Sequence, residues 1–187
     1  MRAGTPPKDS LTLRRGSLSI GGHVRIMGVD PSLRRTGYGV LELLPGSERL
    51  LDCGVIAVGP KKSELDCLRE IYRGISQVLV EQKAEEIAIE SVIYVQNHRT
   101  AIQLGAARGV TLLAAGNVDI PVFEYPPRRA KTAATGSGSS RKAQVAFMVR
   151  SLLGLRENLP FDAADAVAVA LAHAAARRRS LALRRSS

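Results

Sequence analysis

The first part of the chain alternates short apolar runs with turn residues. Aliphatic and β-branched residues fill positions 24–30, 36–44 and 49–58, and segments that contain proline or glycine separate these runs. Runs of this length and composition predict β-strands. We expect the three strands to form an antiparallel meander.

After these runs the apolar spacing changes to helices alternating with strands. Between Ser63 and Lys83 apolar residues recur at helical spacing, and Ser63 is suited to cap that helix. The pattern predicts strands at residues 86–90 and 120–125. It predicts helices at 98–116, about 139–153 and 162–177, and a loop at 126–138. The order βββαβαβαα predicts an α/β fold with a mixed five-stranded sheet, three antiparallel strands and then two parallel ones, flanked by helices.

Length and composition fit one folded domain of ordinary size. We assign residues 24–177 to that domain, 1–23 to a disordered N-terminal extension and 178–187 to a basic C-terminal tail. Two cysteines, Cys53 and Cys67, make no disulfide framework and have no histidine near them to complete a zinc site. No apolar run approaches the roughly 20 residues of a membrane span. We expect a cytoplasmic protein with no membrane partner.

The net charge of +10 is unevenly distributed along the chain. Most of it lies in the two ends, because residues 26–172 hold 17 basic and 16 acidic residues. Within that nearly neutral body, residues 126–156 hold seven bases and no acid. A basic stretch of this kind fits a solvated helix face, but its Pro/Gly/Ser loop favours an anionic partner, and nucleic acid is the usual one.

Four acidic residues lie at the ends of apolar elements. Asp30 closes the first strand and Glu90 the fourth, while Asp162 and Asp165 share one face of the last helix through their i, i+3 spacing. Each one has a structural explanation, such as a turn at Asp30-Pro31 or a helix cap at Asp162. Four converging carboxylates without matching bases would repel one another, and divalent cations that prefer oxygen ligands relieve that repulsion. A pair of such ions can activate a water to hydrolyse a phosphodiester, and this reaction needs no Ser, Cys or His nucleophile.

Several stretches carry a family resemblance. They are Gly28-Val29-Asp30-Pro31-Ser32 with Thr36-Gly37-Tyr38-Gly39, Ala88-Ile89-Glu90-Ser91-Val92, Leu104-Gly105-Ala106-Ala107-Arg108-Gly109-Val110, Asp162-Ala163-Ala164-Asp165-Ala166, and the basic positions Lys131 and Ser140-Arg141-Lys142-Ala143-Gln144-Val145. Together they resemble the RuvC crossover-junction endodeoxyribonucleases, which resolve Holliday junctions in bacteria. The likeness covers about residues 24–175, and motifs that are weak singly are specific when they occur in this order.

The resemblance implies a ribonuclease-H-like fold and a homodimer that makes paired nicks in four-way junction DNA during recombination and repair. It also implies that Asp30, Glu90, Asp162 and Asp165 are catalytic ligands of Mg²⁺, two ions per site, with Mn²⁺ as a substitute. Lys131 and Lys142 are then catalytic residues near the DNA phosphate, and the RuvA–RuvB branch-migration complex is a partner. The DNA contacts that we expect are Ile93, Tyr94, Arg99, Arg128, Arg129, Lys131, Ser139, Arg141 and Lys142.

Two features depart from the family pattern. The family has an aromatic residue three positions after the glutamate, thought to stack on an unpaired base, whereas this chain has Ile93 there and Tyr94 next. Either Tyr94 takes over the stacking or the wedge is aliphatic. The second departure is the extension 1–23, since relatives start at or just before the first strand.

Two other functions remain open from the sequence. Asp30-Pro31-Ser32 with Thr36-Gly37 also resembles the phosphate loop of actin-like kinases, but 187 residues are too few for their two lobes. A non-enzymatic alternative is a ribonuclease-H-like nucleic-acid-binding module that has lost its activity. The presence of all four acids argues against that alternative.

Overall fold

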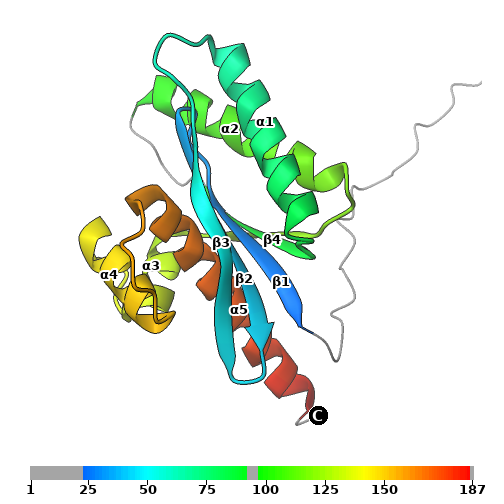
Figure 1. Cartoon of the computed structure of the whole chain (residues 1–187), viewed down its shortest axis with the longest axis vertical. Helices are drawn as coiled ribbons and strands as arrows, with labels where there is room; N and C mark the ends of the chain where they lie inside the picture. Colours follow the sequence, from blue (N-terminus) through cyan, green and yellow to red (C-terminus); the bar gives the residue numbers. More distant parts are fainter. Residues whose placement is uncertain (1–22, 92–96, 186–187) are drawn as a thin grey trace, which may run out of the picture.

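A mixed five-stranded sheet forms the centre of the protein in the computed structural model, which describes residues 23–91 and 97–185. Its strands are β1 (Val24–Asp30), β2 (Arg35–Leu44), β3 (Ser47–Ala57), β4 (Glu86–Glu90) and β5 (Val122–Tyr125). They lie in the order β3-β2-β1-β4-β5. The first three are antiparallel, and β4 and β5 run parallel to β1 (Figure 1). This arrangement confirms the sheet predicted from the sequence.

Helices cover both faces of the sheet (Figure 1). On one face α1 (Glu64–Glu81) and α2 (His98–Gly116) pack over a core that includes Met27, Ile87 and Ile71. On the other face α5 (Phe161–Arg185) crosses the sheet, with α3 (Pro127–Thr135) and α4 (Lys142–Leu152) beside it. Ser63 caps α1 as predicted, because its side chain accepts a hydrogen bond from the backbone of Asp66.

Two glycines let α5 lie unusually close to the sheet. A Cβ added to Gly28 would stand 2.1 Å from the backbone oxygen of Ala166, and one added to Gly37 would stand 2.0 Å from that of Asp162. No side chain fits at such distances. Glycine at these positions therefore brings the first turns of α5 against β1 and β2, which is the region where the conspicuous acids lie.

The structure corrects two predicted elements. The sequence predicts a loop at residues 126–138, but 127–135 form helix α3, which starts at a proline and ends at Gly136 in the left-handed region with φ 78°. Proline is tolerated at the first helical position because its missing N–H has no partner there anyway. The sequence also predicts that the last helix ends near Arg177, but α5 continues to Arg185, and Arg178 forms an ion pair with Glu48 on β3 at 2.6 Å.

The predicted tail 178–187 therefore begins as helix, and residues 186–187 lie outside the described part of the chain. The extension 1–23 also lies outside it, apart from His23. None of the helices formed by the described residues is long and apolar enough to cross a membrane.

Candidate active site

Asp30 and Glu90 end two neighbouring parallel strands. The register of β1 and β4 pairs Val29 with Ile89, so the next residue on each strand is one of these acids. Both carboxyls are mostly buried, and a side-chain hydrogen bond joins them. Strand pairing thus brings together two acids that are 60 positions apart in the sequence.

Asp162 and Asp165 approach the same strand ends from α5. Gly37 is the register partner of Asp30 on β2, and its lack of a side chain lets the backbone of Asp162 lie directly above it. Lys142, the first residue of α4, reaches both acids of α5: its Nζ is 3.0 Å from Asp165 Oδ2 and 3.7 Å from Asp162 Oδ1. The structure therefore brings together all four acids predicted from the sequence, with Lys142 beside them.

The electrostatics of the cluster are dominated by carboxylates that lack enough opposite charge. Burial, together with the neighbouring charges of Glu90 and Asp165, raises the pKa of Asp30 to about 8. Burial and the charge of Asp165 also raise the pKa of Glu90, although the Asp30 hydrogen bond and two lysines oppose the rise. In the absence of a cation, the site therefore holds a proton on its deepest carboxyl at neutral pH.

Lys131 and Lys142 both act on this cluster. Burial works against the charged form of Lys142, but its hydrogen bond to Asp165 and the surrounding acids raise its pKa overall. Lys131, on α3, lies close enough to Glu90 for its positive charge to lower the pKa of that carboxyl. Lys142 therefore stays positively charged at neutral pH.

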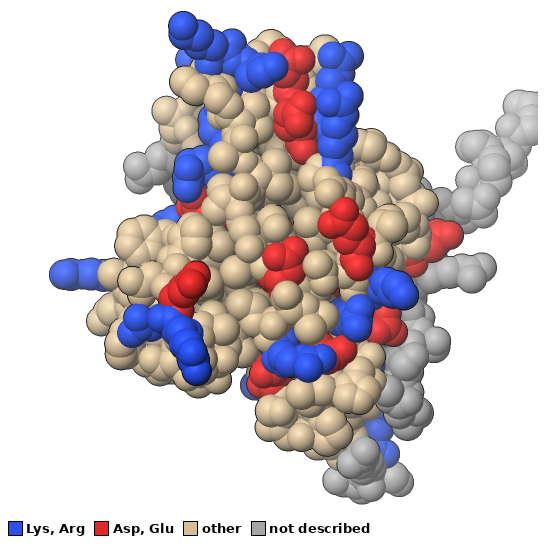
Figure 2. Space-filling view, in the orientation of Figure 1, with Lys and Arg blue, Asp and Glu red and all other residues tan. Residues whose placement is uncertain are grey.

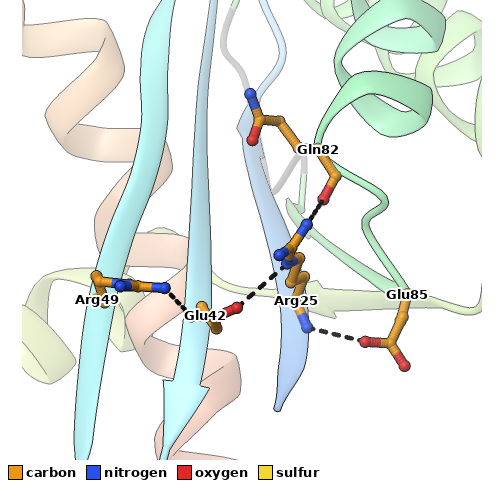
Figure 3. Close-up of polar contacts among 5 residues, drawn as sticks. All are labelled: Arg25, Glu42, Arg49, Gln82 and Glu85. Atoms are coloured by element: carbon orange, nitrogen blue, oxygen red, sulfur yellow. Dashed lines mark hydrogen bonds and ion pairs between the residues drawn. The ribbon is translucent and has the colours of Figure 1, made fainter.

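Buried acids elsewhere in the fold have matched cations. At the opposite end of the sheet, Glu42 accepts hydrogen bonds from Arg25 at 3.3 Å and Arg49 at 2.5 Å (Figure 3). The Arg49 hydrogen bond is the main reason that the pKa of Glu42 lies below its usual value. Glu86 is likewise held by Arg177 at 2.6 Å and by His173 at 2.7 Å. The acids at the strand ends differ from these structural pairs in having excess negative charge.

The donor chemistry of the cluster fits a hard divalent cation. All four side chains offer carboxylate oxygens, which Mg²⁺ and Mn²⁺ accept as ligands. Across residues 23–91 and 97–185, however, no three His, Cys, Asp or Glu side chains are grouped tightly enough to hold an ion as they stand. The ammonium of Lys142 lies among the acids instead and supplies part of the missing positive charge.

Helices α3 and α4 carry the other predicted DNA contacts. Arg128, Arg129 and Arg141 are exposed there, as is Ser139 in the turn between the helices. The turn folds back on α3, since a Cβ at Gly138 would lie 3.2 Å from the side chain of Arg128. On the face shown in Figure 2, basic and acidic side chains are interspersed without a large patch of one sign. The excess positive charge is not gathered on that face.

The other three predicted contacts belong to other parts of the chain. Arg99 is exposed in the first turn of α2. Ile93 and Tyr94 lie outside the described residues.

Sequence reasoning missed Arg35, the first residue of β2, whose Nε donates a hydrogen bond to Asp162 Oδ2 at 2.8 Å. The available signal was the strand alternation that puts Arg35 on the same face as Gly37.

The comparison that decides the family is a match over most of the chain. The profile of the family described as "Crossover junction endodeoxyribonuclease RuvC" matches residues 26–173, which include all four acids. The chain belongs to the RuvC family. The family consists of endodeoxyribonucleases that depend on a metal, and the chain is a hydrolase of this class.

Individual RuvC proteins agree with this assignment. The RuvC of Akkermansia muciniphila is 41% identical over 150 residues, which cover 80% of this chain and 90% of that protein. The RuvC of Chlorobium phaeovibrioides is 43% identical over 149 residues, 78% of each chain. A solved Thermus thermophilus RuvC in complex with a Holliday junction substrate is 34% identical, covers 83% of this chain and 96% of its own, and has a TM-score of 0.77. The predicted ribonuclease-H-like resolvase fold is thereby confirmed.

Proposed function

We propose that this RuvC-family chain is a Holliday junction resolvase that makes paired, symmetric nicks in four-way DNA junctions during recombination and repair. The observation that carries the proposal is the set of four carboxylates at the ends of β1 and β4 and on α5, with Lys142 beside them. The solved Thermus thermophilus relative, whose substrate is a Holliday junction, supports the choice of DNA.

Asp30, Glu90, Asp162 and Asp165 are the residues that would hold Mg²⁺, two ions per site, with Mn²⁺ as a substitute. Carboxylate oxygens match the ligand preference of these ions. A bound pair of ions supplies an activated water and stabilises the leaving oxygen of an in-line displacement. Because the pKa of Asp30 is about 8, cation uptake at neutral pH requires this carboxyl to release its proton.

The two lysines of the site act on the DNA phosphate. Lys142 stays protonated beside the acids, and its ammonium donates up to three hydrogen bonds. One of these holds a non-bridging oxygen of the scissile phosphate while the carboxylates bind the cations. Lys131 approaches from the side of Glu90 and has the same role.

Exposed basic side chains on α3 and α4 bind the neighbouring phosphates. Arg128, Arg129 and Arg141, with Ser139 between the helices, present charged and hydroxyl groups to solvent near the two lysines. Arg99 at the start of α2 contacts a further phosphate. Such contacts fix the orientation of the duplex arms without reading their sequence.

We assign the opening of the junction centre to the segment that follows Glu90 in the sequence. Stacking of a base on an aromatic ring contributes about 1–3 kcal/mol, and isoleucine has no ring face to offer. Tyr94 rather than Ile93 is therefore the wedge. Single-turnover cleavage by Tyr94→Ala should be slower than by Ile93→Ala at equal thermal stability. A slow Ile93→Ala beside a Tyr94→Ala of normal rate would reverse this assignment.

A homodimer is part of the proposal, because two equivalent sites make two matched nicks in a near-symmetric junction. Ile102, Gly105, Gly109 and Leu113 follow one exposed stripe of α2. A Cβ at either glycine would meet nothing within 4 Å. The stripe thus offers an exposed, partly apolar surface for a second copy. Cooperation with the RuvA–RuvB branch-migration complex belongs to the same proposal.

The test is cleavage of a synthetic four-way junction compared with a linear duplex of the same sequence, with Mg²⁺ or with a chelator. We expect paired nicks in the junction alone and only with the metal. Asp165→Asn should abolish cleavage but leave junction binding intact or tighter, because a negative charge facing phosphate is removed. Asp119→Asn, an exposed acid after α2, is the matched control and should cut normally.

Two results would contradict the proposal. Junction binding without cleavage at any metal concentration would favour the inactive nucleic-acid-binding module. Wild-type cleavage by Asp165→Asn would remove that residue from the ligand set.

A further inference from the structure

The two carboxylate oxygens of Asp162 have different surroundings. Oδ2 accepts a hydrogen bond from Nε of Arg35 at 2.8 Å. Oδ1 lies 3.7 Å from Nζ of Lys142, which is also 3.0 Å from Asp165. One oxygen is thus directed toward the other acids of the site, and the second is held from the outside by Arg35.

The backbone fixes the position of Arg35 relative to Asp162. Arg35 is two residues before Gly37 on β2, so their Cα–Cβ directions point to the same face of the sheet. The first turn of α5 lies against this face, where a Cβ at Gly37 would be 2.0 Å from the backbone oxygen of Asp162. The close contact between β2 and α5 therefore places the guanidinium of Arg35 beside the carboxylate of Asp162.

We propose that Arg35 is a positioning residue that orients the Asp162 carboxylate, with Oδ1 toward the divalent cation. The inference rests on the proposed function, because it requires Asp162 to be a cation ligand. Outer partners that hydrogen-bond a ligating side chain fix its orientation, and their loss weakens metal affinity about 10- to 100-fold. A carboxylate has lone pairs for both contacts, so Oδ2 accepts from Arg35 while Oδ1 serves the cation.

Removal of Arg35 should change cation affinity in opposite directions, depending on whether Arg35 acts by orienting Asp162 or only through its charge. Arg35 is positive, so by charge alone its removal would strengthen the binding of a cation. Its side chain is 60% exposed, and solvent screens that repulsion. The Asp162 side chain is only 21% exposed and loses its outer hydrogen bond when Arg35 is removed. Orientation therefore predicts weaker cation binding, and charge alone predicts tighter binding.

The experiment titrates Mn²⁺ into the full-length protein without DNA, and the decrease of the free-ion electron paramagnetic resonance signal reports binding. We expect Arg35→Ala to weaken Mn²⁺ binding about tenfold. Arg73→Ala, an exposed arginine on α1 that pairs with Glu70, carries the same charge change and should bind as the wild type does. Adding Arg35→Ala to Asp162→Asn should cause no further loss, because Arg35 acts through that carboxylate.

Equal or tighter Mn²⁺ binding by Arg35→Ala would overturn this inference alone. A further loss in the double variant, as large as in the single one, would also overturn it. A wild-type protein that binds no Mn²⁺ would instead overturn the proposed function, and this inference with it.

Discussion

At the scale of single residues, Asp30 is the group whose ionisation the fold opposes most clearly. Its pKa is about 8 in the folded protein against 3.8 for the ordinary side chain. Between these values the folded state binds more protons than the unfolded state, so stability falls as pH rises through this window. Below the lower value both states are protonated, and the effect disappears.

This linkage predicts that Asp30→Asn stabilises the metal-free protein at about pH 8 more than at about pH 5. The gain should exceed 1 kcal/mol, since one pKa unit corresponds to about 1.4 kcal/mol. Thermal melts of both proteins with a chelator, at the two pH values, measure it. Asp119→Asn should show no such dependence, and a pH-independent gain in Asp30→Asn would show that burial of the ionised form is not its cause.

The four acids and Lys142 were predictable from the sequence, but Arg35 and the pairing of each cation with its acid were not. Asp30 and Glu90 each follow a buried strand, and parallel neighbours in a sheet bring such ends together. The ion pairs of Arg35 and Lys142 with Asp162 depend on the tertiary placement of three separate elements. Strand alternation puts Arg35 on the same face as Gly37, but it does not indicate which residue lies opposite Arg35, and Asp162 is 127 positions further along the chain.

At the scale of elements, the contact between β2 and α5 determines the geometry of the site. Gly37→Ala places a Cβ against the Asp162 backbone and forces strand and helix apart. We expect a loss of about 1–3 kcal/mol in the free energy of unfolding. Junction cleavage should fall on the order of 100-fold, because an ångström of misplacement is enough for that.

Gly116→Ala is the matched control for this change. Its Cβ would meet nothing within 4 Å at the end of α2, so stability should be equal or slightly higher. Denaturant unfolding and single-turnover cleavage test both variants. Normal cleavage by Gly37→Ala would show that the close approach is not needed for the site.

Helix α3 shows where sequence patterns fail at this scale. Pro126-Pro127 and the glycines at 136 and 138 indicate a loop, and the segment is too short for a clear apolar period. Its stability comes instead from burial of Ala130 and Ala134 against neighbouring helices. Small alanines carry little hydrophobic signal, so tertiary packing outweighs local preference.

At the scale of the whole molecule, the stripe on α2 predicts the oligomeric state. Leu113→Asp puts a charge into the proposed dimer contact and should give a monomer by analytical ultracentrifugation. The monomer should nick one strand of a junction without the matched second nick. Leu65→Asp changes a leucine on α1 that is equally exposed, 56% against 57%, and should remain a dimer. A dimeric Leu113→Asp would place the interface elsewhere.

The charge distribution of the whole molecule predicts the salt dependence of DNA binding. Removing a basic side chain that binds a phosphate flattens the plot of log K against log[salt] by about 0.9. Arg128→Ala with Arg141→Ala should therefore reduce the slope by about 2, one unit for each arginine. The control pair Arg69→Ala with Arg73→Ala removes the same charge from α1 and should change it little. Equal slopes for the two double variants would mean that net charge, and not the α3–α4 surface, attracts DNA.

The order of the elements along the chain has a consequence for biosynthesis. Asp30 and Glu90 belong to strands completed early in translation, whereas Asp162 and Asp165 lie on the last helix. A ribosome-bound chain that stops before Phe161 contains the residues of all five strands but only half of the acids. A nuclease that damages DNA while incomplete would harm the cell that makes it. With the proposed ligand set, the capacity to cut would arise only when α5 emerges and docks, at the end of synthesis.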